Sequence, residues 1–278
     1  MKNALCLGTF DGVHMGHLAV LDIPQEYRKI AVTFKEPPKL VVSGNCEMII
    51  TESDKETALK KCGVDEILNL DFNAVRDTLP LDFLCELKQR FNPSLISCGF
   101  NYRFGKAAAG DTGTIAEFCR ENDILFNCVQ SVCEDDMPVS STYIRNLLKL
   151  GEIAKANSLM RFPFSFEAEV IEGNHLGRTI GFPTVNQKYP EKLVKLRFGV
   201  YKTKIIVRDN EYYGITNIGV KPTVGSNIVL SETYIKDFSG DLYGEDLRVI
   251  PMEFLRDEKK FSSLAELKEQ INKDLACI

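Results

Sequence analysis

The chain has 278 residues, of which 44% are hydrophobic and 26% are charged. This balance is typical of a folded globular protein and excludes a wholly disordered or collagen-like chain. The 34 basic and 39 acidic residues give a net charge of −5. We therefore expect no nucleic-acid partner, because binding a polyanionic backbone requires a large basic surface. The length fits one large domain or two domains of ordinary size.

Cysteine usage and hydropathy indicate the compartment. The nine cysteines include no CxxC pair, so we expect free thiols rather than a disulfide framework or a structural zinc site. The first residues, MKNALCLGTFDGVH, lack the apolar core of a signal peptide. No apolar run approaches the roughly 18–20 residues that span a bilayer. We therefore expect a cytoplasmic protein with no membrane partner.

The first half alternates short apolar runs with amphipathic stretches. Strands are expected at 4–8, 30–34, 66–70, 94–98 and 124–129. Helices are expected at 54–62, 81–91, 112–122 and 141–159. Alternating strands and helices predict an α/β domain, in which helices cover both faces of a parallel sheet.

The pattern of predicted secondary structure changes near residue 160. From there strand-like runs follow at 166–173, 200–209, 211–219, 228–235 and 245–254, with a turn expected at Asp209-Asn210. We favour a small closed barrel over an open sheet, because closure removes exposed strand edges. The helical stripe at 262–274 predicts a C-terminal helix preceded by Ser263.

A glycine-rich segment follows the first expected strand and reads GTFDGVHMGH from Gly8 to His17. A turn of this kind directs backbone N–H groups and a helix N-terminus toward a phosphate. His14 and His17 are three residues apart, so on a helix both imidazoles face the same side. There they can stabilise the charge that builds on a triphosphate attacked at its α-phosphorus. The alternatives are a loop with incidental histidines and half of a metal site.

Two weaker motifs follow, CGFNYRFG at 98–105 and SSTYIR at 140–145. In the second, the hydroxyls of Ser141 and Thr142 at a helix start and Arg145 one turn later can hold phosphate oxygens. The alternative is an ordinary helix N-cap.

The second half contains GNHLGRTIGFPTVN at 173–186. Its glycines allow the backbone to approach a nucleotide closely. Thr184 and Asn186 offer neutral oxygen ligands for a Mg²⁺ that keeps phosphate and water in its shell. The alternative is a turn-rich barrel loop. His175 is expected to be a surface or hinge residue rather than a catalyst.

The motifs together resemble a known family. In chain order, GTFDGVHxGH, GFxxRFG, SSTxIR, GRxxGFPTxN, ETYIxDFxGDLYG and LRxExKF resemble the bacterial bifunctional riboflavin kinase/FMN adenylyltransferases, also called FAD synthetases. The resemblance spans nearly the whole chain. It implies an α/β plus β fold, with a Rossmann-like HxGH nucleotidyltransferase domain over 1–160. A small antiparallel β-barrel riboflavin kinase domain with a C-terminal helix would occupy 161–278.

For the first half, the resemblance implies transfer of the AMP part of ATP onto FMN, giving FAD and pyrophosphate. His14 and His17 would stabilise the pentacovalent phosphorus. The implied nucleotide-binding residues are Gly8, Thr9, Phe10, Gly16, Ser141, Thr142 and Arg145. The implied flavin-binding residues are Asn101 and Arg103.

For the second half, the resemblance implies transfer of the γ-phosphoryl of ATP to the 5′-hydroxyl of riboflavin. Thr184 and Asn186 match the ligands of Mg²⁺–ATP, and Glu232 matches the catalytic base. A base is chemically required, since a primary alcohol must lose a proton as it attacks phosphorus. The implied nucleotide-binding residues of this half are Gly177, Arg178, Gly181 and Pro183.

The first half departs from the family pattern. The usual TFxPHP run is TFKEPP at 33–38, without its histidine, and the stretch between His17 and Ile30 is shorter and contains Pro24. A lysine followed by three alanines stands after RFG, where an arginine is frequent. One alternative is therefore a riboflavin kinase with a weakened or re-purposed nucleotidyltransferase half. Another is a non-catalytic flavin- or nucleotide-binding regulator. Weak self-association is left open.

Overall fold

The computed structural model describes residues 1–44, 47–173, 176–223 and 226–278. The chain forms two compact units. The first contains Met1–Ile144 and Leu159–Phe162, and the second contains Arg145–Ser158 and Pro163–Ile278.

The first unit is built on a parallel five-stranded sheet with the order β3-β2-β1-β4-β5. Its strands are β1 (Lys2–Leu7), β2 (Tyr27–Phe34), β3 (Glu66–Leu70), β4 (Pro93–Gly99) and β5 (Leu125–Val129). All five predicted strands are present within a few residues. A two-stranded ribbon of β6 (Cys133–Glu134) and β7 (Met137–Pro138) follows.

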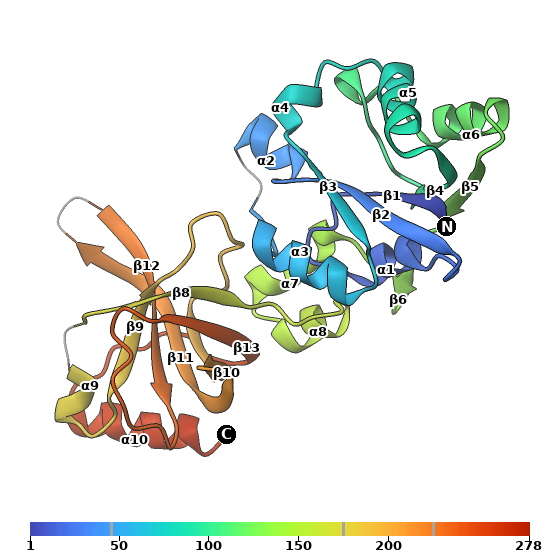
Figure 1. Ribbon diagram of the computed structural model, residues 1–278. Helices are drawn as coiled ribbons and strands as arrows, with labels where there is room; N and C mark the ends of the chain where they lie inside the picture. Colours follow the sequence, from blue (N-terminus) through green and yellow to red (C-terminus); the bar gives the residue numbers. More distant parts are fainter. Residues whose placement is uncertain (45–46, 174–175, 224–225) are drawn as a thin grey trace. The chain divides into compact units, whose positions relative to one another are not determined.

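Helices cover both faces of this sheet, as the alternating pattern predicts (Figure 1). They are α1 (Met15–Leu21), α2 (Pro38–Ser43), α3 (Glu52–Lys61), α4 (Phe72–Val75), α5 (Pro80–Phe91) and α6 (Thr112–Glu121). One face packs apolar side chains of α5 and α6 onto the sheet, and the other packs those of α1 and α3. A short 3₁₀ helix, Lys106–Ala108, precedes α6. The short helices α2 and α4 were not expected from the sequence.

The single helix expected at 141–159 is wrong. The structure has two helices, α7 (Ser141–Leu150) and α8 (Ile153–Ser158). Gly151 separates them with a φ of 83°, a left-handed conformation that ends a helix and that glycine adopts without a Cβ clash.

The second unit is a closed six-stranded barrel with the order β10-β11-β12-β9-β8-β13. Its strands are β8 (Phe166–Ile171), β9 (Thr184–Lys188), β10 (Gly199–Val207), β11 (Asn210–Thr223), β12 (Ser226–Ile235) and β13 (Asp246–Arg256). A one-turn helix α9 (Leu176–Thr179) precedes β9. The barrel is confirmed, but β9 is a strand where the sequence analysis expected a loop.

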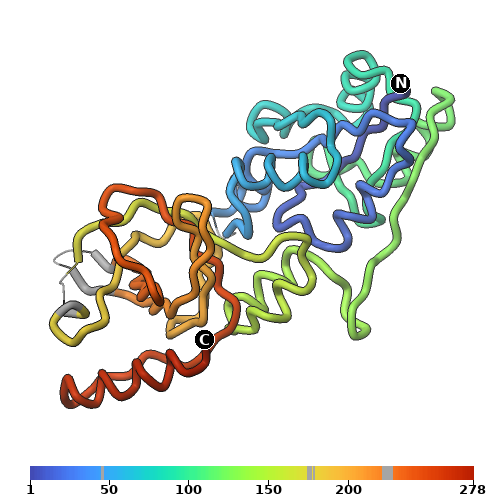
Figure 2. The backbone as a smooth tube through the Cα atoms, turned by 60° about the horizontal axis from the view of Figure 1, so that its bottom comes forward, coloured from blue at the N-terminus to red at the C-terminus, as the bar shows by residue number. Residues whose placement is uncertain are grey.

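The β10–β11 hairpin turns at Arg208 and Asp209, whose φ angles are 48° and 67°. Asn210 is already in β11 and pairs with Val207, so the turn lies one residue earlier than expected. The C-terminal helix α10 (Leu264–Leu275) packs against the barrel (Figure 2). It is capped by Ser263, whose side chain accepts from the Glu266 N–H.

The barrel interior combines an apolar cluster with a hydroxyl network. Thr203, Thr216 and Thr233 are fully buried. The Thr216 hydroxyl oxygen lies 2.9 Å from that of Thr203 and 2.9 Å from that of Thr233. Each hydroxyl therefore finds a partner, which burial in a small barrel requires.

Across the described part of the chain, no helix is long and apolar enough to cross a membrane. The eight described cysteines are free thiols.

Candidate active sites

The segment from Gly8 to His14 follows β1 at the point where the strand order reverses. From β1 the chain adds β2 and β3 on one side and β4 and β5 on the other. In doubly wound sheets, ligands bind in the crevice at the carboxyl ends of the strands at such a point. The sheet therefore places this loop, and the segment that follows β4, at the edge where a nucleotide is expected.

The loop has a strained and tightly packed backbone. Phe10 and Val13 have φ angles of 49° and 40°, and both are fully buried. A β-branched residue in the left-handed region is a genuine outlier, which persists only where packing holds it there. Such strain is common at functional sites. The buried Phe10 ring packs beside the His17 ring, and the two ring centroids lie 5.2 Å apart.

The two histidines lie on one side of the first turn of α1, as predicted. Their rings are stacked, with centroids 3.7 Å apart and planes inclined by 20°. His14 is the N-cap of α1, and its Nδ1 accepts the His17 N–H at 3.4 Å. Gly16 allows this packing, because a Cβ there would lie 3.2 Å from Cε1 of His14.

The surroundings of His17 favour its neutral imidazole. Burial, followed by the charges of His14 and Lys55, holds the pKa of His17 well below its usual range. The Nδ1 atom of His17 is buried without a hydrogen-bond partner among the described residues. Two adjacent imidazoles with a desolvated nitrogen form a site suited to an anionic ligand.

Two segments, the end of β2 and the start of α7, hold this loop through three hydrogen bonds. Thr33 Oγ1 donates to Thr9 O at 3.0 Å, and the Gly8 N–H donates to Val32 O at 3.2 Å. Ser141 Oγ donates to Asp11 O at 2.9 Å, which brings the start of α7 to the loop.

Asp11 is a site residue that the sequence analysis missed. The residue is only 2% exposed. Its Oδ1 accepts hydrogen bonds from the backbone N–H groups of Ile49 and Ile50 at 2.9 and 3.2 Å. A carboxylate inside a glycine-rich turn was the signal available in the sequence.

The remaining predicted residues of the adenylyltransferase motifs are placed as follows. Asn101 is exposed just beyond β4. Arg103 is paired with Asp111 at 3.1 Å on the surface, where Asp111 also caps α6. Thr142 is exposed on α7, and Arg145 lies three residues along the same helix. Their binding roles stay predictions.

The kinase residues converge on one face of two neighbouring strands. Glu232 on β12 lies directly opposite Asn186 on β9, and Tyr234 lies opposite Thr184. Residues at alternate positions point to the same face of a sheet. The pairing therefore brings Thr184, Asn186 and Glu232 together, as expected for ligands and base of one reaction.

Asn186 has the features expected of a metal ligand. It is 6% exposed, and its Oδ1 is buried without a hydrogen-bond partner in the described part of the chain. Its amide nitrogen packs so closely on Gly173 that a Cβ at that position would overlap it. An orphaned amide oxygen beside a threonine hydroxyl and a carboxylate is a hard-oxygen donor set, which fits Mg²⁺.

The loop before β9 contains the other predicted nucleotide-binding residues. The Phe182 N–H donates to Gly177 O at 2.8 Å, and Gly181 turns with a φ of 86°. Pro183 is exposed directly before Thr184. The side chain of Arg178 and the whole of His175 lie outside the described residues.

Two further residues share the face of Glu232. Asn217 on β11 lies opposite Glu232, and its Nδ2 donates to Glu258 Oε1 at 3.2 Å. Glu258 is the glutamate of the LRxExKF motif, for which the sequence analysis gave no role, and Asn217 was not singled out, because an asparagine on a strand carries no signal of its own.

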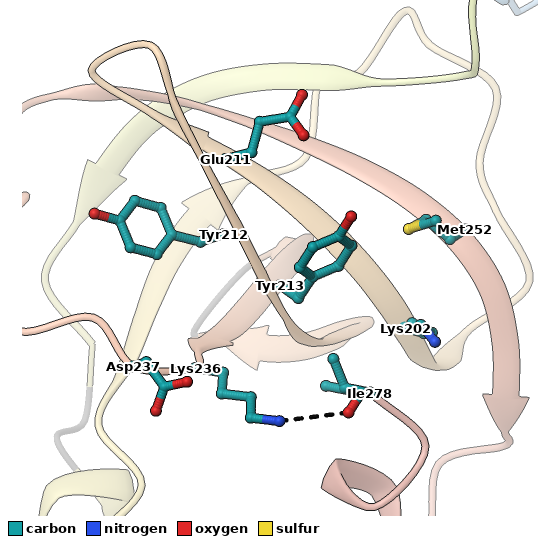
Figure 3. Close-up of a pocket in the computed structure, with 8 residues that line it drawn as sticks. All are labelled: Lys202, Glu211, Tyr212, Tyr213, Lys236, Asp237, Met252 and Ile278. Atoms are coloured by element: carbon teal, nitrogen blue, oxygen red, sulfur yellow. Dashed lines mark hydrogen bonds between the residues drawn. The ribbon is translucent and has the colours of Figure 1, made fainter.

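A separate open cavity of about 550 Å³ lies on the barrel unit, and none of the predicted site residues lines it. Tyr213 and Met252 form part of its wall (Figure 3). Both lysines that line the cavity donate hydrogen bonds to main-chain oxygens: Lys202 Nζ to Cys277 O at 2.8 Å, and Lys236 Nζ to Ile278 O at 3.4 Å. Within the described residues, no cluster of three or more histidine, cysteine or acidic side chains is placed to hold a metal ion.

Comparison with known proteins gives a consistent answer for both units. A family model described as riboflavin kinase matches residues 160–278, and one described as FAD synthetase matches residues 1–143. The chain is 32% identical to a bifunctional riboflavin kinase/FMN adenylyltransferase of Escherichia coli (strain K12), over 97% of this chain and 90% of that protein. It is 31% identical to the protein of the same description from Bacillus subtilis (strain 168), over 98% and 90%.

A solved structure shows the same fold. A crystal structure described as a macrolide-efflux protein from Streptococcus pneumoniae superposes with a TM-score of 0.91 and is 27% identical, covering 99% of this chain and 93% of that one. Both family models and the full-length relatives match in the order that the motifs predict. The chain belongs to the bifunctional riboflavin kinase/FMN adenylyltransferase family.

Proposed function

We propose that the chain makes FAD from riboflavin in two ATP-dependent steps, each in its own unit. The barrel phosphorylates riboflavin to FMN, and the parallel-sheet unit adenylylates FMN to FAD with release of pyrophosphate. The observation that carries this proposal is the coexistence of two separate constellations, the stacked histidines of α1 and the Thr184, Asn186 and Glu232 face of the barrel.

In the adenylylation step, an FMN phosphate oxygen attacks the α-phosphorus of ATP, and pyrophosphate leaves. Negative charge builds on the oxygens of that phosphorus in the transition state. The stacking of His14 and His17 on one side of α1 supports a role for both in donating hydrogen bonds to these oxygens. The Ser141 contact with Asp11 holds the start of α7 beside the loop, where its hydroxyl-rich first turn supports the nucleotide phosphates.

In the kinase step, the riboflavin 5′-hydroxyl attacks the γ-phosphorus of ATP, and ADP leaves. Glu232 accepts the hydroxyl proton as the new oxygen–phosphorus bond forms. Thr184 and Asn186 would hold Mg²⁺, which neutralises charge on the phosphate oxygens when it is bound. The free thiols of the described cysteines fit our expectation that both reactions take place in a reducing cytoplasm.

Product analysis tests this function. Purified protein is incubated with riboflavin, ATP and Mg²⁺, the flavins are separated by chromatography, and pyrophosphate is measured. We expect FMN to form first and FAD to follow, with one pyrophosphate released for each FAD. FMN alone would indicate a kinase with a re-purposed first unit, and no product would indicate a binding regulator.

A further inference from the structure

Lys55 is a buried lysine that neither motif contains. It lies on the face of α3 that packs on the sheet, together with Ala58 and Leu59, and is 3% exposed. Lysine is almost never fully buried unless it is paired, because moving an ammonium group out of water is costly. Its partners therefore indicate why it is there.

The ammonium group of Lys55 links two parts of the adenylyltransferase unit. Its Nζ donates to the Phe34 carbonyl at the end of β2, and lies 3.5 Å from the Lys35 carbonyl. Asp11 favours its charged form electrostatically, followed by Glu52 and Glu56 on α3, while burial lowers the pKa of Lys55. Asp11 belongs to the loop between β1 and the histidines and binds two backbone N–H groups.

Lys55 also acts on His17 through its charge. Besides burial, the groups that lower the pKa of His17 are His14 on the same turn and Lys55 on α3. A positive charge in a buried environment disfavours a second positive charge beside it.

We propose that Lys55 is a positioning residue for adenylyl transfer, which anchors the end of β2 beside the histidine loop and supplies a buried positive charge there. It acts through its charge and through the end of β2, where Thr33 holds the Thr9 carbonyl of that loop, and it needs no contact with substrate. The proposal extends the adenylyltransferase activity to a residue outside both recognised motifs.

Two substitutions separate the anchoring and the charge of Lys55. Lys55→Gln keeps an amide donor for the carbonyls at the end of β2 but removes the charge. Lys55→Arg keeps the charge. Lys60→Met is the matched control, because Lys60 lies on the same helix but is exposed. All variants are made in the full chain, and FMN formation from riboflavin reports in each whether the protein is intact.

For Lys55→Gln we expect kcat for FAD formation from FMN to fall about 10-fold to 100-fold, the loss typical of misplaced reacting groups. The KM for ATP should change less, and FMN formation should stay within twofold of wild type. Lys55→Arg should recover part of the lost kcat. Lys60→Met should leave both activities unchanged.

A readout independent of activity follows the charge state of His17. In NMR titrations of histidine-labelled protein, loss of the neighbouring positive charge should raise the midpoint of His17, so that it protonates at higher pH in Lys55→Gln than in wild type. Lys55→Arg should retain the low midpoint. His17→Ala identifies the resonance.

Either of two results overturns the proposal. One is a kcat for FAD formation from FMN that is unchanged in Lys55→Gln, and the other is an equal loss of kcat in Lys60→Met. A wild-type protein that forms no FAD would instead contradict the proposed function, so the two failures are distinguishable.

Discussion

His17 and Asn186 each bury a polar atom that has no hydrogen-bond partner among the described residues, Nδ1 in the first and Oδ1 in the second. Leaving such a group unsatisfied costs about 1–3 kcal/mol. Both atoms belong to the sequence motifs that point to nucleotide chemistry. A ligand that hydrogen-bonds or coordinates these atoms recovers the cost, which explains why the fold tolerates them.

The histidine pair gives the first prediction. His17→Ala removes a group that we propose stabilises charge in the adenylylation transition state. We expect FAD formation from FMN to fall on the order of 10²–10³-fold, while FMN formation from riboflavin stays near wild type. Chromatography of the flavins measures both rates. Loss of both activities in a protein with a wild-type melting temperature would contradict two separate sites.

The barrel face gives the opposite prediction. Glu232→Gln keeps the shape of the side chain but cannot accept the hydroxyl proton, so FMN formation should fall about 10²–10⁴-fold. FMN supplied directly should still become FAD. Glu253→Gln, an exposed carboxylate on β13, is the control and should keep both rates. A Glu232→Gln protein with normal kinase activity would show that another group is the base.

At the level of single residues, the sequence predicted side chains that lie within recognisable motifs. It missed Lys55, which lies outside them and for which we propose a positioning role. His14, His17, Thr184, Asn186 and Glu232 were predicted, and each pair or triad is brought together. Lys55 was missed because the α3 pattern identifies an apolar face but not the carbonyls that lie beneath it. A lysine on the apolar face of a predicted helix was the available signal.

At the level of elements, α10 is held to the barrel by a buried ion pair. Arg256 and Asp274 are joined by three hydrogen bonds of 2.8 to 3.1 Å, and the Asp274 side chain is 5% exposed. Removing one partner of a buried pair leaves an uncompensated charge and costs about 3–5 kcal/mol.

Asp274→Ala leaves the Arg256 guanidinium, which is 22% exposed, without this partner, so it should destabilise the barrel by less than the about 3–5 kcal/mol of a fully buried pair. Asp257→Ala breaks the Arg197 pair, whose side chains are 44% and 66% exposed, and should cost under about 1 kcal/mol. The measurement is the FMN-forming activity that remains after stepwise heating. Equal heat sensitivity of the two variants would show that the Arg256 pair does not anchor α10.

The sequence predicted long elements better than interrupted ones. Strands with continuous apolar or alternating patterns were expected within a few residues of their bounds. The strand β9 was missed because its residues, TVNQK, include four polar side chains, two of which, Asn186 and Gln187, the barrel buries. The helical period continues through Gly151, so periodicity alone did not separate α7 from α8.

At the level of the whole molecule, the chain places two kinds of architecture in one sequence, a doubly wound sheet and a closed barrel. Composition averages over both and predicts neither. The change of pattern near residue 160 was the informative signal, since it marks where alternating strands and helices give way to strands alone.

Metal dependence is a property of the whole reaction sequence. Both steps move charge across phosphate oxygens, and the predicted ligands are hard oxygens, so Mg²⁺ should be required and zinc should not. Removing Mg²⁺ should abolish both FMN and FAD formation, and adding it back should restore them. A chelator selective for zinc should leave both rates unchanged; loss of both would make the metal assignment wrong.

The central claim is that two independent sites act in sequence, and mixing the two inactive variants tests it most directly. His17→Ala with riboflavin, ATP and Mg²⁺ should accumulate FMN, and Glu232→Gln should leave riboflavin unchanged. Combined in one tube, the two proteins should convert riboflavin to FAD, because FMN released by the first is adenylylated by the second. If each variant keeps its own half-reaction and the mixture still makes no FAD, the account of two independent sites is contradicted.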